Sequence, residues 1–282
     1  MTEKFKNRIW VVTGAGSGIG RALALDLHTR GAKLALSDIK LEMVEETAQL
    51  LGANSADLMV DQLDVADQDG VFAYAAKVNN HFGAAHGVIN NAGVALGSGP
   101  LWTTELEDFK WLMNINFYGV LYGTKAFLPL LQDQDWGHIV NISSLFGIVG
   151  VPDQTAYNAS KFAVRGMTEA LRHELKRDNS SVSCTSVHPG GIKTNIARFA
   201  RVAKNDVDAD EANLLHKQAV SDFDKLARTT PESAAAQIIN AVIKDKQRLL
   251  IGADAKFIEI VQRLFPSSYM KIMAKLMKQS EK

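Results

Sequence analysis

A short apolar run that leads into a glycine-rich turn constrains the fold of this chain more than any other feature. Ile9-Trp10-Val11-Val12 is continuously apolar, as expected for a strand buried on both faces of a sheet. The run leads into Thr13-Gly14-Ala15-Gly16-Ser17-Gly18-Ile19-Gly20, after which residues 21–30 have a helical pattern. Glycines let a backbone approach a pyrophosphate closely, and the N-terminus of a helix offers it free N–H groups. The glycine spacing, G-x-x-x-G-x-G, in this strand–helix context favours dinucleotide binding.

Strand and helix patterns then alternate along the chain. Apolar runs predict further strands at 33–37, 57–65, 87–89, 138–142, 182–187 and 249–251. Helical patterns cover 41–51, 67–82, 106–131, 157–175 and 231–244. This alternation predicts an α/β class with a single-domain Rossmann fold, in which a doubly wound, seven-stranded parallel sheet has helices on both faces.

Composition narrows the class of protein and its surroundings. The 282 residues are 46% hydrophobic and 22% charged with a net charge of zero, which gives no reason to expect nucleic acid as a partner. The single cysteine, Cys184, lies in an expected strand and is interpreted as a core residue. Residues 1–8 are polar and lack the apolar centre of a signal peptide, and no apolar run is long enough to span a bilayer. We expect a cytoplasmic protein without a metal site.

An acidic residue ends the second expected strand. Asp38 comes 18 residues after Gly20, where a carboxylate can accept hydrogen bonds from the adenosine ribose and would repel a 2′-phosphate. Lys40 follows closely, but no Arg or Lys interrupts the glycine turn itself. The pattern therefore favours NAD over NADP. The alternative is that Asp38 only caps the helix that follows.

A phenol and an ammonium group lie four residues apart in Tyr157-Asn158-Ala159-Ser160-Lys161. On a helix, residues i and i+4 share one face. A cation close to a phenol favours the phenolate, so Lys161 is expected to lower the pKa of Tyr157 toward the range useful for acid–base catalysis. The alternative is that the pair is structural, since such spacings are common on helices.

Polar residues also occupy two positions where a structural role and a site are both conceivable. Asn90-Asn91-Ala92-Gly93 follows the fourth expected strand, where it could be a simple turn or border a ligand at the carboxyl edge of the sheet. Asn116 interrupts the apolar pattern of 106–131, so it either bends that helix or serves a site.

Taken together, these segments resemble the short-chain dehydrogenase/reductase family in its single-domain branch, over about residues 6–252. Four separate signatures agree in order and spacing: Thr13-Gly14-x-x-x-Gly18-x-Gly20, Asn90-Asn91-Ala92-Gly93, Ser144 with Tyr157-x-x-x-Lys161, and Pro189-Gly190 with Thr194. The resemblance implies an enzyme that interconverts a secondary alcohol and a ketone by hydride transfer to or from NAD.

The resemblance also implies roles for individual residues. Tyr157 would be the general acid–base, and Ser144 would bind the substrate oxygen in preference to its neighbour Ser143. Lys161 would tune the tyrosine and hold the nicotinamide ribose, and Asn116 would hold a water on the proton path. The implied cofactor contacts, besides Tyr157 and Lys161, are Gly14, Ser17, Gly18, Ile19, Gly20, Asp38, Asp64, Val65, Asn91, Gly93 and Thr194.

Two regions differ from the regular alternation. Residues 192–229 mix charged and scattered apolar positions and are interpreted as a lid inserted into a dinucleotide-binding and catalytic domain of residues 1–252. Residues 253–282 carry two amphipathic helical patterns and are expected to extend the same domain. The extension could cover the substrate mouth, form a subunit contact, lie on a membrane surface, or pack on the chain's own core.

These regions shape the remaining expectations. Family members commonly form tetramers through this end of the sheet, so the extension leaves both a homodimer and a homotetramer open. The apolar character of both regions suggests a hydrophobic alcohol or ketone as the small-molecule substrate. The alternatives are an NADP-dependent carbonyl reductase of the same family and a cofactor-binding regulator without catalysis.

Overall fold

A computed structural model describes residues 4–97, 99–201 and 209–280 of the chain. Its central element is a seven-stranded sheet in the order β3-β2-β1-β4-β5-β6-β7, and every neighbouring pair of strands is parallel. The strands are β1 (Ile9–Thr13), β2 (Lys33–Asp38), β3 (Leu58–Gln62), β4 (Gly87–Asn90), β5 (Gly137–Ile142), β6 (Val182–Pro189) and β7 (Arg248–Ile251). The predicted doubly wound parallel sheet is confirmed.

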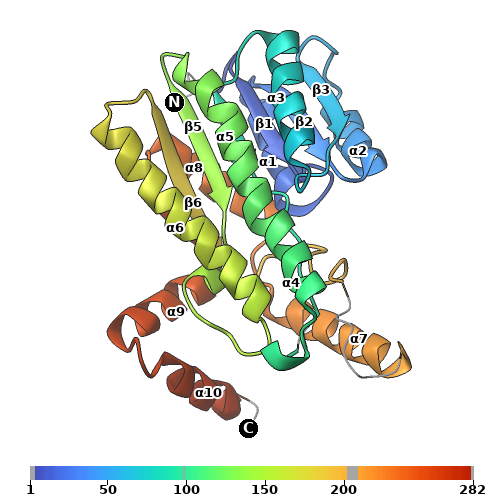
Figure 1. The fold of residues 1–282 in the computed structure, drawn as a ribbon, viewed down its shortest axis with the longest axis vertical. Coiled ribbons are helices and arrows are strands. Elements are labelled where there is room, and N and C mark those ends of the chain that lie inside the picture. Colours follow the sequence, from blue (N-terminus) through green and yellow to red (C-terminus); the bar gives the residue numbers. More distant parts are fainter. Residues whose placement is uncertain (1–3, 98, 202–208, 281–282) are drawn as a thin grey trace.

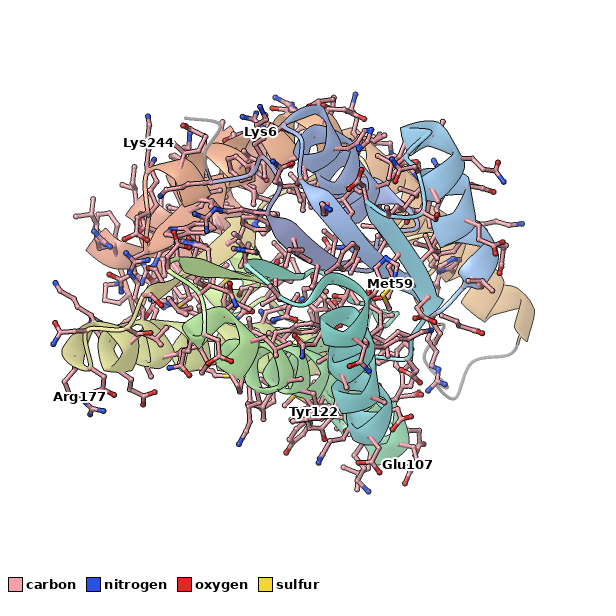
Figure 2. The ribbon with its side chains drawn as sticks, turned by 90° about the horizontal axis from the view of Figure 1, so that it is seen from above. Lys6, Met59, Glu107, Tyr122, Arg177 and Lys244 are labelled. Carbon is pink, nitrogen blue, oxygen red and sulfur yellow. The ribbon has the colours of Figure 1, made fainter. Side chains whose placement is uncertain are left out.

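Helices cover both faces of this sheet, as Figures 1 and 2 show. Figure 2, seen from above, shows the strands edge-on between two helical layers. The helices are α1 (Gly18–Thr29), α2 (Leu41–Leu51), α3 (Gln68–Phe82), α4 (Leu106–Met113), α5 (Gly119–Gln132), α6 (Thr155–Arg177), α7 (Ala209–Leu226), α8 (Pro231–Ile243), α9 (Ala253–Leu264) and α10 (Tyr269–Ser280).

The helices on each face of the sheet pack over a separate apolar core. Side chains of β1 alternate between the two faces, as the two-residue period of a strand requires. Trp10 packs in the core beneath α1, α2 and α8, whereas Val11 packs in the core beneath α3, α5 and α6. Because both faces are covered, all five residues of β1 and all six of β5 are buried, and the continuous apolar run of β1 is explained.

Local sequence signals set several helix ends. The predicted boundaries of α2 are met, and the helix stops at Gly52, which has a positive φ of 59°. Gly83 ends α3 in the same way with a φ of 75°. The hydroxyl of Thr230 accepts a hydrogen bond from the backbone N–H of Ser233 at 3.2 Å, so α8 starts with the predicted cap and Pro231.

The single helix predicted over 106–131 is wrong in detail. A π-helical segment, Asn114–Tyr118, separates α4 from α5 and contains the buried Asn116. Such a segment inserts an extra residue into the helical ladder and occurs often at functional sites.

The second half of the region expected to be a lid, residues 192–229, contains a helix of 18 residues, α7. Leu214, Leu215 and Leu226 of α7 are exposed, so the helix has no single apolar stripe directed at the core, and its pattern gave no clear helical period. The part of the expected lid at 202–208 and the last two residues of the expected extension lie outside the described residues.

The expected amphipathic helices after β7 are present as α9 and α10, which lie below the carboxyl edge of the sheet at the lower left of Figure 1. Ala255 and Val261 of α9 are buried, while Phe257, Ile260 and Leu264 remain exposed. Within the part of the chain that is described, no helix is both long and apolar enough to cross a membrane.

Candidate active site

The glycine-rich turn lies at the carboxyl end of β1, where the strand order reverses because β1 pairs with β2 on one side and β4 on the other. Ligands of open α/β sheets bind at this switch point. Gly14 and Gly18 have positive φ values of 64° and 52°. A Cβ added to Gly14 would lie 2.8 Å from the Cα of Ala92, and one added to Gly18 would lie 3.1 Å from Cγ2 of Thr194. The turn is therefore closely lined by the segments after β4 and β6, and its backbone is open only because glycine occupies these positions.

Hydrogen bonds from the end of β4 fix the turn. Asn91 Nδ2 donates to the carbonyl oxygens of Thr13 and Gly14 at 2.9 and 3.0 Å. The Thr13 hydroxyl accepts from the backbone N–H groups of Asn91 and Ala92, both at 3.1 Å. Asn91 thus holds the glycine turn directly, and the Asn–Asn–Ala–Gly segment is more than a connection.

A second set of contacts holds the turn from the side of α2. The Thr47 hydroxyl donates to the Ala15 carbonyl oxygen at 2.9 Å and accepts from Arg21 Nε at 3.0 Å. Neither residue was a sequence candidate. Their partners lie 26 and 32 positions away in sequence, so no local spacing indicates the contacts.

Asp38 at the end of β2 faces the glycine turn. Its Oδ2 accepts a hydrogen bond from the Gly16 N–H at 3.0 Å, and its Oδ1 accepts from the Lys40 N–H at 3.2 Å. The carboxylate therefore accepts hydrogen bonds both from the segment that leads into α2 and from the glycine turn. Lys40 Nζ lies 5.0 Å from the ring centroid of Phe199, in the segment after β6.

The remaining candidates for the adenine end lie just after β3. Asp64 is exposed, and its Oδ1 accepts from the Ala66 N–H at 2.9 Å. Val65 is buried close to Gly119 at the start of α5, where an added Cβ would lie 2.8 Å from Val65 Cγ2. At the start of α1, Ser17 is the N-terminal cap residue and Ile19 packs against the core beneath α1.

Ser144 and Tyr157 meet at the end of β5. A hydrogen bond between their side chains acts to lower the pKa of Tyr157, but burial acts more strongly in the other direction and raises it to about 12. Ser144 Oγ also accepts from the Phe146 N–H at 3.1 Å. The neighbouring Ser143 points elsewhere, since its hydroxyl donates to the Lys161 carbonyl oxygen at 2.8 Å. Of the two serines, Ser144 is the one in contact with the tyrosine.

Lys161 lies one helical turn after Tyr157, with Nζ 5.6 Å from the centre of the tyrosine ring. The ammonium group is buried and donates to the Ile142 carbonyl oxygen at 3.2 Å. Burial lowers the pKa of Lys161 to about 8. The prediction that Lys161 lowers the tyrosine's pKa is therefore wrong for this arrangement, because loss of water penalises the charged form of both groups.

Asn116 connects the π-helical segment to the loop after β4. Its Oδ1 accepts from the Val94 N–H at 2.8 Å, and its Nδ2 donates to the Val94 carbonyl oxygen at 2.9 Å. A Cβ added to Gly93 would lie 3.2 Å from Asn116 Oδ1 and 3.5 Å from Lys161 Nζ. The backbone at Gly93 thus lies against both side chains. The helix is distorted at Asn116, as one of the two interpretations expected, and the amide orders the loop after β4.

A small cavity borders Tyr157. Its wall comes from the loop after β4, the segment before α4, and the segment before α6 with the first turn of α6, namely Leu96, Gly97, Gly99, Thr104, Asp153, Gln154, Thr155, Ala156 and Tyr157. A larger hollow of about 470 Å³ lies between the starts of α8 and α9, lined by residues 228–230, Ser233, Gln237, Gly252, Ala253 and Lys256. None of the candidate residues lines that hollow, whereas Tyr157 lines the small cavity. Within the described ranges, no group of three or more His, Cys, Asp or Glu residues could hold a metal ion.

Two further residues shape the site and were not sequence candidates. Asn158 Nδ2 donates to the carbonyl oxygens of Phe146 and Val149 at 2.8 and 2.9 Å, which folds the segment after Ser144. His188 Nδ1 lies 3.0 Å from the Ser144 carbonyl oxygen, and burial lowers the pKa of this histidine to about 4. In the neutral ring, the Nδ1–H group therefore donates a hydrogen bond to the Ser144 carbonyl oxygen. Asn158 stands beside Tyr157 in sequence, but nothing local indicates its partners.

A dinucleotide cradle at the switch point, with a Ser–Tyr–Lys group beside it, defines a class of α/β oxidoreductase. The family model described as short chain dehydrogenase matches residues 8–205. A protein of Mycobacterium tuberculosis named "Putative oxidoreductase SadH" is 46% identical over 272 residues, which is 96% of each chain. A mouse protein, dehydrogenase/reductase SDR family member 7B, is 33% identical over 95% of this chain and 81% of its own length.

A solved structure agrees with these sequence matches. The short chain dehydrogenase/reductase of Burkholderia phymatum, determined in complex with NAD, superimposes with a TM-score of 0.85 and 29% identity over 92% of this chain and 94% of its own. The chain belongs to the short-chain dehydrogenase/reductase family, and it is an oxidoreductase of that family.

Proposed function

We propose that the protein is an NAD-dependent oxidoreductase that interconverts a secondary alcohol and a ketone, with a hydrophobic small molecule as substrate. One observation carries the proposal. The group of the partly buried Ser144 and Tyr157 and the buried Lys161 lies at the same end of the sheet as the glycine turn. A proton-transfer group and a dinucleotide cradle are thereby placed side by side.

The cradle suits a dinucleotide. The first turn of α1 presents its N-terminus at the glycine turn, and added Cβ atoms at Gly14 and Gly18 would fill the space beside the backbone. We assign Gly14, Ser17, Gly18, Ile19 and Gly20 to the pyrophosphate. We assign the rest of the cofactor as follows: Asp38 to the ribose of the adenosine, Asp64 and Val65 to the adenine, Asn91 and Gly93 to the border of the cofactor, and Thr194 to the carboxamide.

The residues of the chain supply position and proton transfer. When bound, the cofactor supplies the hydride chemistry. Tyr157 gives its hydroxyl proton to the carbonyl oxygen of a ketone, or as phenolate takes the proton of an alcohol. Ser144 donates a hydrogen bond to the same oxygen. With a pKa raised by burial, Tyr157 holds its proton at neutral pH, which suits reduction.

Lys161 and Asn116 complete the group. We assign Lys161 to the nicotinamide ribose, and Asn116 to holding a water on the path by which the proton of Tyr157 is exchanged with solvent. The close approach of Gly93 to both Asn116 Oδ1 and Lys161 Nζ supports a shared path along this edge.

The charge around Asp38 supports NAD over NADP. The carboxylate borders the glycine turn at Gly16 and would repel a 2′-phosphate. The nearest cation in the sequence, Lys40, lies over the ring of Phe199.

A panel of secondary alcohols and ketones of increasing chain length, assayed with NAD(H) and NADP(H), tests the proposal. We expect turnover with NAD(H), a kcat/KM that rises with apolar length, and a dissociation constant for NADH at least about tenfold below that for NADPH. Binding of NADH without turnover of any compound would instead identify a cofactor-binding regulator. Tighter binding of NADPH would identify a carbonyl reductase that uses NADP.

A further inference from the structure

The segment between Ser144 and Tyr157 is held from within the core by the residue after the tyrosine. Asn158 donates to the carbonyl oxygens of Phe146 and Val149, and its Oδ1 accepts from the Val151 N–H at 3.0 Å. None of these three hydrogen bonds involves Gly150, which lies between Val149 and Val151. Gly150 is exposed at the surface.

The C-terminal region supplies the missing contact. The Tyr269 hydroxyl at the start of α10 accepts from the Gly150 N–H at 2.9 Å and donates to the Gly150 carbonyl oxygen at 3.2 Å. One hydroxyl therefore satisfies both backbone groups of a single residue, across 119 positions of sequence. Asn158 and Tyr269 together fix the backbone from 146 to 151 from opposite sides.

Apolar packing supports the same contact. Leu145, Ile148 and Val149 form a small buried cluster with Ala255 of α9, and the Tyr269 ring packs against that cluster. The segment continues into residues 153–157, which line the cavity beside the Tyr157 side chain. A shift at Gly150 would therefore be transmitted along a short stretch of chain to the wall of that cavity.

We propose that Tyr269 is a positioning residue for the substrate site, and that residues 253–280 serve to fasten the loop between Ser144 and Tyr157. This inference rests on the proposed function for its effect on the substrate, but the contact itself does not depend on it. The match to the Mycobacterium tuberculosis protein covers 96% of this chain, so most of the C-terminal extension lies within it.

Hydrogen exchange of the full-length protein tests the contact without any substrate. Tyr269→Phe keeps the ring and removes only the hydroxyl. We expect the Gly150 amide to exchange about fivefold faster or more, since a neutral hydrogen bond contributes roughly that factor. Tyr122→Phe is the matched control, because among the described residues the Tyr122 hydroxyl makes no hydrogen bond, and Tyr122 lies in α5 whereas Tyr269 begins α10.

Kinetics test the consequence. With a substrate found in the panel, Tyr269→Phe is expected to raise KM by about three- to tenfold while kcat and the NADH dissociation constant change less than about twofold, because a displaced wall weakens substrate binding equally in the ground state and the transition state. Tyr122→Phe is expected to match the wild type in all three.

Unchanged exchange at Gly150 in Tyr269→Phe would overturn the proposal. Faster exchange with an unchanged KM would overturn the link to the substrate site, and a joint loss of kcat and NADH affinity would point to general loss of structure and overturn it too. If the wild type turns over no compound, the proposed function fails, and the exchange measurement alone decides whether Tyr269 fastens the loop.

Discussion

At the scale of single residues, burial dominates the chemistry of the site. Lys161 is buried and Tyr157 is partly buried. Loss of water moves their pKa values to about 12 for Tyr157 and about 8 for Lys161, toward the neutral form of each group. The hydrogen bond with Ser144 acts in the opposite direction on Tyr157 and lowers its pKa. The site therefore holds a neutral phenol ready to give a proton rather than a preformed phenolate.

Asp38 offers a test of cofactor choice at the same scale. Asp38→Asn keeps an oxygen that can accept from the Gly16 N–H but removes the negative charge. We expect the ratio of NADPH to NADH dissociation constants, measured by fluorescence titration, to fall by about tenfold, because repulsion of the 2′-phosphate is relieved. Lys40→Ala should leave the ratio within about twofold. A ratio unchanged by Asp38→Asn would remove the basis for NAD preference.

At the scale of elements, the segment after β6 is fastened to α4. Arg201 pairs with the buried carboxylate of Asp108 at 3.0 Å, and its guanidinium lies 4.1 Å from the ring centroid of Trp111. Its backbone also pairs with Ala95 and Gly97, after β4. Arg201 therefore joins the segment after β6 to α4 and to the loop after β4, and that loop lines the cavity beside Tyr157.

Removing Arg201 should therefore lower the free energy of unfolding, because it leaves the Asp108 carboxylate without its ion-pair partner. Arg201→Ala leaves Asp108 buried and uncompensated, and we expect the free energy of unfolding in urea to fall by about 2 kcal/mol, less than for a fully buried pair because Arg201 is half-exposed. Adding Asp108→Asn in that background should restore part of the loss. A change below about 0.5 kcal/mol for Arg201→Ala would show that the ion pair contributes nothing measurable.

The elements also show what sequence could and could not predict. The glycine turn, the exact span of α2 and the Tyr157–Lys161 spacing follow from local patterns. The π-helical segment around Asn116 could not be predicted from such a pattern, because one extra residue in the ladder of helical hydrogen bonds leaves the apolar pattern nearly unchanged. The contacts of Asn158, His188 and Tyr269 were missed because their partners lie up to 119 positions away, and the pKa directions were missed because burial is a property of the folded chain.

At the scale of the whole molecule, two buried histidines couple stability to pH. His138 is bonded to the Thr185 hydroxyl at 2.9 Å, and burial lowers its pKa to about 3, with Arg172 and Lys4 acting in the same direction and Asp245 against it. Burial lowers the pKa of His188 to about 4, and the charges of Arg248 and Arg165 act in the same direction. The hydrogen bond to the Ser144 carbonyl oxygen and the charge of Glu169 act against it.

Acidification should therefore destabilise the fold before its carboxylates titrate. The unfolded histidines, with a pKa of 6.5, bind protons that the folded ones do not, so stability present at pH 7 is lost as pH falls below 6.5. Between pH 7 and pH 5 we expect the two together to lower the free energy of unfolding by about 4 kcal/mol. His138→Gln should remove about half of that decline, as measured by urea denaturation at both pH values. An undiminished decline in this variant would contradict the assignment.

The central claim is that Tyr157 transfers the proton beside a bound dinucleotide. Its most direct test is the turnover of Tyr157→Phe with the best compound of the panel, measured alongside the NADH dissociation constant of the same variant. We predict a loss of turnover of at least about a thousandfold, with NADH affinity within about threefold of the wild type. A variant that binds NADH normally and keeps more than a tenth of the wild-type rate would contradict the account.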